Sequence, residues 1–454
     1  MRKMAGLMLG TSMMLMAAPQ TALAQNASAD DIAALRAEIA SLRSQIATLE
    51  SRVNSVETVP APAPVAPPVV AAVAKPAKPA TEIAWKGAPE LKQADGWSFK
   101  PRGRIQIDVA GVDAPDAVSP TRLGIGTEFR RVYLGVEGKM PGGFGYRAEA
   151  DFANSSVELT DVYVNYSKGP LTVTAGQIKP FWSMEEITSD LFTSFMERAA
   201  FNSAFGFERR VGLAAAYRKG DVLAQAGVFG DNANDLLNDA NNSFSVDGRL
   251  VFLPKVGDTQ LHFGGSFHRR TFNDTASTTR YQARPFSHIT DLRLINTGNI
   301  TATGEDGMGV EFAAIKGPFH ASAEGFWQSV RRPGLPDPTF FGGYAEVGMM
   351  LTKGDTSAYK DGVYDRTKPA KPLSAGGPGA VQFNLRYDYL DLNDAGIVGG
   401  RQKTLGASIV WTPIEYVRLT ANYGHLTFDD AAVSAAGDRD YSANVLGLRT
   451  QIDF

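Results

Sequence analysis

Residues 442–454 read SANVLGLRTQIDF, and apolar and polar side chains alternate along this stretch. In an extended chain the apolar face holds Leu446, Leu448, Ile452 and Phe454, and the opposite face holds Arg449, Gln451 and Asp453. A period of two is typical of a β-strand with one face in water and the other in an apolar environment. The same alternation recurs in 143–153, 380–392 and 415–428, so the sequence predicts an all-β body over residues 96–454.

Turn residues divide this body into alternating segments. Short Gly/Pro turns, such as 140–143 and 168–170, alternate with long polar loops, such as 180–209 and 271–306, which is the pattern of outer-membrane barrels. The sixteen predicted strands are 98–112, 127–139, 143–153, 157–167, 171–179, 210–218, 222–230, 243–253, 259–270, 307–316, 318–330, 341–353, 380–392, 402–411, 415–428 and 442–454. We therefore expect a 16-stranded antiparallel transmembrane β-barrel that encloses an aqueous channel. Successive connections alternate between the two ends of the barrel, so counting strands places the long stretch 354–379 at the end that carries the short turns. Residues 287–299 are predicted to be part of a loop.

A soluble β-sandwich also alternates, but two features favour a membrane barrel. Charges of both signs lie opposite the apolar face, as a water-filled lumen requires. Aromatic residues also gather near the predicted strand ends, as membrane-interface girdles do: Tyr166, Phe229, Phe252, Trp327 and Trp411.

The composition excludes several classes of function. The 454-residue chain has no cysteine, which excludes disulfide scaffolds, thiolate zinc sites and cysteine nucleophiles. Its net charge of -3 argues against a nucleic-acid partner. No nucleophile–base pair, phosphate loop or dinucleotide fingerprint occurs, so we predict neither an enzyme nor a cofactor or metal site.

The N-terminal region has three parts. Residues 1–24 read as a signal peptide, with a charged start, an uncharged stretch and a small-residue cleavage site. Residues 25–57 carry apolar residues at 3-4 spacing, which predicts a coiled-coil oligomerisation helix; its core residues favour a dimer and leave a trimer open. Residues 58–95 are predicted to be a Pro/Ala-rich periplasmic spacer, with seven prolines in 58–80.

A series of motifs runs through the body in a fixed order: FKPRGRIQIDVAG, FRRVYLGVEGKM, YRAEADF, GQIKPFWSMEEITSD, FMERA, RRVG, LTKGDTSAY, TKPAKP, LRYDYLDLND, VWTP and LRTQIDF. Over residues 98–454 they resemble the phosphate-selective porin O and P family. The resemblance implies a homotrimeric porin in outer-membrane lipid whose loop after the fifth strand, here 180–209, folds inward and narrows the pore. It also implies that the terminal Phe454 is read by the barrel-assembly machinery.

Arginines on the polar strand faces are candidates for anion contacts in the lumen. The alternation points the following inward: Arg104, Arg131, Arg147, Arg249, Arg270, Arg386, Arg418 and Arg449. Carboxylates share this face: Asp108, Glu149, Asp151, Asp247, Glu324, Asp388 and Asp453. Residues 96–454 hold 36 Lys and Arg against 40 Asp and Glu, so a salt-bridged wall is the simpler interpretation.

The resemblance adds specific positions. In phosphate-specific relatives, an arginine of the first strand and an arginine pair of the second contribute to the binding site; they match Arg104, Arg130 and Arg131, and Tyr133 is retained. Strict alternation sends Arg130 outward, whereas a bulge would turn both arginines inward. The constriction stretch that carries lysines in those relatives has acids in 185–190, with Ser189 kept beside Asp190, which argues against a cationic phosphate cage. Other cations near the loop are candidates to compensate: Lys179, Arg198, Arg209 and Arg210.

We therefore expect a porin for passive diffusion of small hydrophilic solutes, with anions such as phosphate or pyrophosphate favoured. The residues predicted to line the pore are Arg104, Arg130, Arg131, Tyr133, Arg147, Ser189, Asp190, Arg386 and Arg418. Two alternatives remain open: a general, weakly selective porin, and a structural anchor tethered to the cell wall through its coiled coil.

Overall fold

The computed structural model describes residues 40–50, 81–119, 123–153, 156–235, 243–272 and 278–454. The chain divides into two units, Met1–Pro76 and Ala77–Phe454. In the first unit, residues 40–50 form a helix on which Leu42, Ile46 and Leu49 are exposed. The predicted signal peptide, the rest of the coiled-coil range and spacer residues 58–80 lie outside the described residues. Within the described ranges, no helix has the length and hydropathy needed to cross a bilayer.

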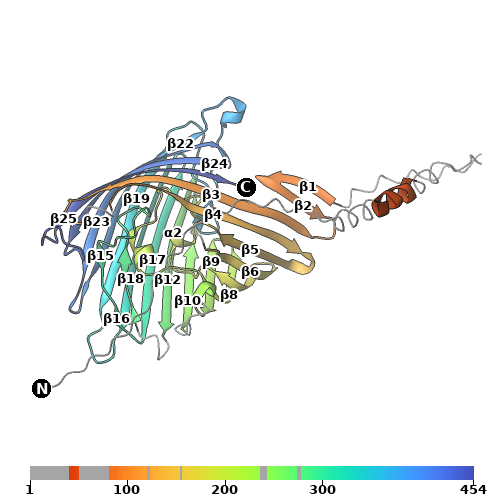
Figure 1. Ribbon diagram of the computed structural model, residues 1–454. Helices are drawn as coiled ribbons and strands as arrows, with labels where there is room; N and C mark the ends of the chain where they lie inside the picture. Colours follow the sequence, from red (N-terminus) through yellow and green to blue (C-terminus); the bar gives the residue numbers. More distant parts are fainter. Residues whose placement is uncertain (1–39, 51–80, 120–122, 154–155, 236–242, 273–277) are drawn as a thin grey trace, which may run out of the picture. The chain divides into compact units, whose positions relative to one another are not determined.

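In the second unit, sixteen strands of the described ranges close into an antiparallel barrel (Figure 1). Their bounds are β3 (Ser98–Asp113), β4 (Gly124–Met140), β5 (Phe144–Asp151), β6 (Glu158–Lys168), β7 (Leu171–Ile178), β8 (Arg210–Lys219), β9 (Val222–Phe229), β10 (Phe244–Phe252), β12 (Thr259–Thr271), β17 (Gly304–Lys316), β18 (Phe319–Arg331), β19 (Thr339–Met350), β22 (Ala380–Asp394), β23 (Ile397–Ile414), β24 (Val417–Asp429) and β25 (Tyr441–Asp453). Each strand pairs with the next, and β25 pairs with β3 through Arg449 and Asp108. The predicted number, order and orientation of the strands are confirmed.

The two ends of the barrel differ in the length of their connections. At the short-turn end, several hairpins have two-residue turns, and Gly169 and Gly317 there adopt positive φ of 57° and 55°, which glycine allows without strain. Long loops join the strands at the other, long-loop end. The smaller elements are η1 (Pro141–Gly143), α2 (Met184–Ile187), α3 (Ala200–Ala204), η2 (Ala233–Asp235), β11 (Lys255–Val256), β13 (Thr278–Thr279), β14 (Gln282–Ala283), β15 (Ile295–Asn296), β16 (Ile300–Thr301), β20 (Tyr359–Lys360), β21 (Val363–Tyr364) and η3 (Leu373–Ala375).

The alternation of side chains along the strands follows the sequence pattern. On β25, Leu446, Leu448 and Ile452 are exposed on the outer face, whereas Arg449 and Asp453 are buried on the inner face. One predicted girdle residue is wrong: Phe229 is 1% exposed and packs against Phe181 and Ala214. It follows Gln225 by four positions on β9, so a period of two turns both side chains into the lumen.

Part of the range predicted as spacer forms a hairpin instead. The strands β1 (Thr81–Lys86) and β2 (Ala88–Gln93) pair with each other, and β2 continues onto β3 through Leu91 and Phe99. The dense prolines end at residue 79, and the following TEIAWK favours a strand. Gly87 makes the turn with φ of +79°, and a Cβ there would meet the ring of Tyr416.

Candidate functional site

The constriction loop (residues 180–209) leaves β7, crosses the lumen and returns to β8. Its main chain is held by charged side chains of the wall: Met184 N and Glu185 N donate to Glu324 at 2.8 Å each, Ala200 N donates to Asp388 at 2.7 Å, and Arg418 Nη1 donates to Leu191 O at 2.7 Å. Phe201 is fully buried, and its ring centroid lies 6.4 Å from those of Phe326 and Tyr344. The loop therefore folds inward, as the resemblance implies.

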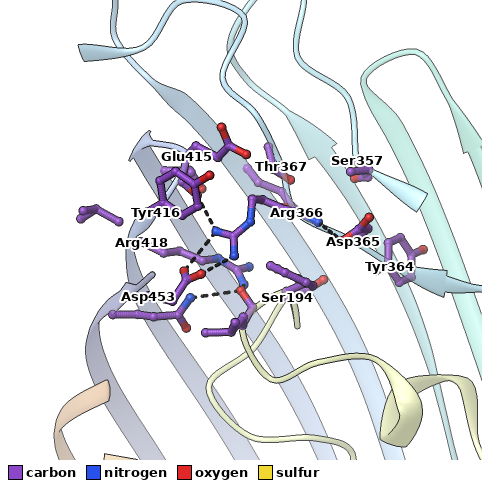
Figure 2. Close-up of a pocket in the computed structure, with 17 residues that line it drawn as sticks. Ser194, Ser357, Tyr364, Asp365, Arg366, Thr367, Glu415, Tyr416, Arg418 and Asp453 are labelled. Atoms are coloured by element: carbon purple, nitrogen blue, oxygen red, sulfur yellow. Dashed lines mark hydrogen bonds and ion pairs between the residues drawn. The ribbon is translucent and has the colours of Figure 1, made fainter. Parts of the chain in front are cut away.

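A second segment enters the lumen from the short-turn end. This floor segment (residues 351–379) joins β19 to β22 and carries the small hairpin β20–β21. Its contacts reach across the barrel: Arg249 Nη2 donates to Gly362 O at 2.9 Å, Tyr359 bonds to His262, Ser357 Oγ lies 3.2 Å from His320 Nδ1, and Arg366 pairs with Asp453. Figure 2 shows Arg366 beside Asp453 and Arg418, close to Ser194 of the constriction loop. Counting strands predicted the end of the barrel at which this segment lies, but not that it inserts into the lumen.

Together the two segments cover one half of the lumen wall. Among the described residues, the inner face of β10, β12, β17, β18, β19 and β22 carries six buried carboxylates: Asp247, Glu305, Glu311, Glu324, Glu346 and Asp388. The arginines of that face are Arg249, Arg270 and Arg386. These carboxylates bond locally, as in the chelate of Glu311 by Arg249 at 2.7 Å and the pairing of Glu346 with Arg386 at 2.7 Å. These six carboxylates are thus buried, and of the six only Asp388 lines one of the two cavities described below.

The other half of the wall remains open. A cavity of about 530 Å³, here the short-turn cavity, lies along β3 and β5–β9. Six cationic side chains line it: Arg102, Arg104, Arg147, Lys179, Arg209 and Arg366. The carboxylates that line it are Asp161 and Asp190, whereas Glu149, which pairs with Arg102 at 2.8 Å, has a side chain only 1% exposed. Cationic side chains therefore outnumber carboxylates six to two among the residues that line this cavity.

A second cavity of about 260 Å³, here the long-loop cavity, lies on the other side of the constriction loop. Residues 282–293 of the connection between β12 and β17 also line it. Its cations include Arg130, Arg131 and Arg198.

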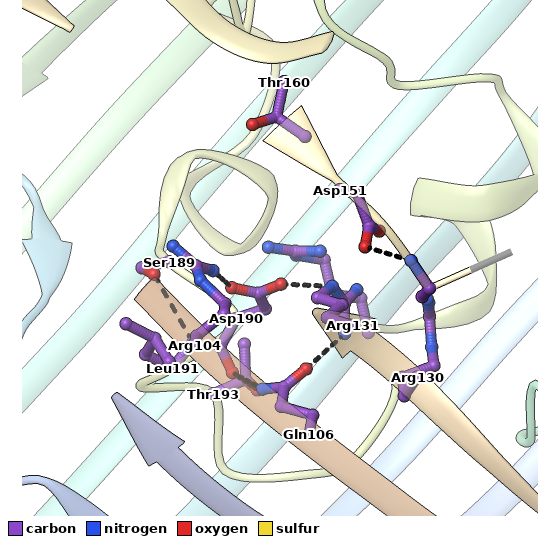
Figure 3. A network of polar contacts seen from close by, with 12 residues as sticks. Arg104, Gln106, Arg130, Arg131, Asp151, Thr160, Ser189, Asp190, Leu191 and Thr193 are labelled. Atoms are coloured by element: carbon purple, nitrogen blue, oxygen red, sulfur yellow. Dashed lines mark hydrogen bonds and ion pairs between the residues drawn. The ribbon is translucent and has the colours of Figure 1, made fainter. Parts of the chain in front are cut away.

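Two carboxylates of the constriction loop separate the cavities. Asp190 pairs with Arg104 of the short-turn cavity and with Arg131 of the long-loop cavity, and Figure 3 shows it between them. Burial alone would raise the pKa of Asp190, but the two guanidinium groups outweigh it and hold this pKa well below the usual carboxyl range. Asp190 thus stays charged and occupies the position between the two arginines that a solute anion would need.

Glu186 repeats this arrangement four residues earlier in the loop. Its carboxylate lies 2.8 Å from Lys179 Nζ of the short-turn cavity and 3.5 Å from Arg198 Nε of the long-loop cavity. Asp190 and Glu186 therefore each pair with one cation of the short-turn cavity and one cation of the long-loop cavity. These two carboxylates belong to the acidic stretch 185–190 identified in the sequence.

Arg130 and Arg131 both reach the lumen because the ladder is irregular. Gln106 pairs with Arg131 and Ile107 with Phe129, so Arg130 is the extra residue of a bulge. Arg130 chelates Glu197 at 3.0 and 3.1 Å. Arg104 lies 4.6 Å from the ring centroid of Tyr133.

The remaining predicted residues lie apart from this boundary. Arg147 lines the short-turn cavity and pairs with Glu137 at 2.7 Å. Ser189 lines it too, and accepts a hydrogen bond from Leu191 N at 3.4 Å. Arg386 is buried between Glu185 and Glu346, and Arg418 holds the constriction loop.

Sequence reasoning missed some lining residues. Arg102 lies two positions before Arg104 on the same strand face, so alternation alone would have found it. Arg366 comes from the floor segment, and no periodicity points to it. Lys179, Arg198 and Arg209 were named without a direction, which the loop's path supplies: Lys179 and Arg209 face one cavity and Arg198 the other.

Comparisons with known proteins agree with this architecture. A family model described as phosphate-selective porin O and P matches residues 99–454. An uncharacterized protein of Caulobacter vibrioides is 46% identical over 461 residues, covering 96% of this chain and 93% of that protein. Among solved structures, a loop-deletion mutant of OmpT, an outer membrane protein of Vibrio cholerae, superposes with a TM-score of 0.52 at 10% identity, covering 79% of this chain and 100% of that one. An anion-selective porin from Comamonas acidovorans gives 0.50 at 14% identity, with 79% and 100% covered.

The structural matches show the shared fold, a β-barrel like those of outer-membrane porins. The match of the family model extends over nearly the whole second unit. The chain therefore belongs to the phosphate-selective porin O and P family, whose model covers residues 99–454.

Proposed function

We propose that this porin passes small anions by passive diffusion along the open half of its lumen. One observation carries the proposal: the short-turn cavity is lined by six cationic side chains, while the six carboxylates of the opposite wall are buried. A cationic surface beside low-dielectric walls raises the local concentration of anions. The solved porin from Comamonas acidovorans is described as anion-selective, which supports the same direction.

Phosphate belongs to this solute class, but the boundary differs from a phosphate-binding cage. Asp190 pairs with Arg104 and Arg131, so these guanidinium groups already have an anionic partner. Phosphate and pyrophosphate then pass without a tight saturable site. Purified protein in planar bilayers tests this: we expect ohmic channels in which phosphate inhibits chloride current only weakly. The absence of ohmic conductance would contradict the channel itself.

The cationic lining also predicts a pH dependence. Burial and the neighbouring Arg198 lower the pKa of Lys179 to about 8, so this side chain loses its charge as the pH rises through that value. We expect the Cl⁻/K⁺ permeability ratio to fall between about pH 7 and about pH 9. Lys179→Arg keeps its charge over this range and should lose that step. Equal falls in both proteins, measured from reversal potentials in a KCl gradient, would show that another group titrates.

We also propose a homotrimer with the N-terminal helix as a parallel coiled coil in the periplasm. Leu42, Ile46 and Leu49 form an exposed apolar stripe at 3-4 spacing on the described helix, and such a stripe is buried when helices associate. One solved OmpT structure is described as a trimer form. Ile46→Asp should reduce the oligomeric stability in detergent while single-channel conductance stays unchanged. An unchanged thermal dissociation of the oligomer would argue that the barrels associate without the helix.

A further inference from the structure

The long-loop cavity has two polar acceptors that the protein leaves open. Asp388 and Gln402 are 1% and 2% exposed, and both line the cavity. Among the described residues, Asp388 Oδ1 and Gln402 Oε1 have no hydrogen-bond partner. Buried acceptors without a donor are unfavourable.

The other polar atom of each side chain fixes its position. Ala200 N donates to Asp388 Oδ2 at 2.7 Å, and Gln402 Nε2 donates to Thr404 Oγ1 at 3.2 Å. The open atoms therefore belong to held side chains. They offer acceptors to a ligand that brings hydrogen-bond donors.

A cation lines the same cavity. Arg284 Nε donates to Thr290 O at 3.0 Å, and Arg284 forms no ion pair with a described residue. Burial, reinforced by the charge of the nearby Arg130, lowers the pKa of Arg284 from its usual value and outweighs the opposing effect of Glu197, Glu128 and Asp291.

Phe286 places an apolar surface beside these groups. Its φ of 54° lies in the left-handed region, which a bulky residue adopts only where the surrounding structure holds it. Its N–H donates to Arg284 O at 2.9 Å, so the tight turn links the two side chains. Phe286 and Phe207 both line the cavity.

We propose that the long-loop cavity is a binding site for a small organic carboxylate that also carries hydrogen-bond donors, such as a hydroxy acid or an amino acid. Its carboxylate pairs with Arg284, its hydroxyl or ammonium hydrogens bond to Asp388 Oδ1 and Gln402 Oε1, and its carbon skeleton contacts Phe286. This site rests on the proposed anion path. It would select solutes by their hydrogen-bond donors in addition to their charge and size.

Block of chloride current through the full-length protein in planar bilayers tests the site. The probes are gluconate, which has both a carboxylate and hydroxyls, hexanoate, which has the charge alone, and sorbitol, which has hydroxyls alone. We expect gluconate to block at about tenfold lower concentration than hexanoate, and sorbitol not to block. Serine, compared with gluconate, shows whether an ammonium group serves as well as hydroxyls. Equal block by gluconate and hexanoate would overturn the proposal.

Two variants locate the effect. Asp388→Asn replaces an open acceptor by a donor, and Gln402→Met removes one at similar volume; each should raise the gluconate concentration for half-block toward that of hexanoate. Gln328→Met is the matched control, because Gln328 is also buried with an open Oε1 but lies outside the cavity. A gluconate preference that survives both cavity variants would contradict the site. The reversal potential of the same membranes reports the anion path separately, so that either proposal can fail without the other.

Discussion

Asp190→Asn will convert the boundary between the two cavities into a phosphate site. The substitution removes the carboxylate that pairs with Arg104 and Arg131, and leaves both guanidinium groups facing solute. Arg104 then keeps only Glu149 at 3.9 Å, and Arg131 has no carboxylate within ion-pair distance among the described residues, so both can donate charge-assisted hydrogen bonds to a phosphate. We expect the phosphate concentration that halves the chloride current to fall about tenfold, equivalent to about 1.4 kcal/mol. Asp190→Lys adds a third cation and should lower this concentration further.

Asp258→Asn is the control for this experiment. It removes the same charge from an exposed turn at the short-turn end, away from both cavities. Its phosphate block should equal that of the unaltered protein. If Asp190→Asn also left the block unchanged, Arg104 and Arg131 would not lie on the solute path.

Replacing residues 357–367 by a shorter Gly/Ser linker will enlarge the channel and weaken its preference for anions. This change removes the hairpin that covers His262 and His320. His262 contacts Glu311 and His320 contacts Glu346, so these two carboxylates are uncovered as well. Water and ions then reach Glu311 and Glu346, whose arginine partners on the wall are Arg249 and Arg386. We expect single-channel conductance to rise and the reversal potential in a KCl gradient to move toward that of K⁺.

A deletion at the opposite end controls for shortening a loop as such. Residues 333–337 lie in an exposed connection between β18 and β19 and line neither cavity. Their removal should leave conductance and reversal potential unchanged. A floor variant with higher conductance and an unchanged reversal potential would show that the buried carboxylates do not influence selectivity.

The strands were predictable because a lipid-facing barrel imposes a strict period of two on its side chains and an alternation of short turns and long loops on its connections. Leu446 and Arg449 point to opposite faces, as the sequence pattern indicated. The girdle position predicted for Phe229 is wrong because the period of two along β9 turns its side chain inward, although it lies at a strand end. The hairpin β1–β2 was not predicted, because the proline-rich spacer was expected to continue to residue 95, whereas its dense prolines end at residue 79.

The site was less predictable, since alternation gives the face of a residue and not what covers it. Glu324 and Asp161 both face inward, yet Glu324 is buried against the constriction loop while Asp161 lines a cavity. The overall charge therefore pointed to a salt-bridged wall, and many of the arginines are indeed paired. What the count missed is that inserted segments bury the carboxylates of one half and leave a cationic surface on the other.

The reversal potential of the full-length porin in a KCl gradient at neutral pH tests this separation most directly. A chain with a net charge of -3 would favour cations if all its lumen charges were equally accessible. Because cationic side chains outnumber carboxylates among the residues that line the short-turn cavity, we predict a reversal potential shifted from zero toward the equilibrium potential of chloride. A reversal potential shifted toward the equilibrium potential of potassium would contradict an anion-selective lumen.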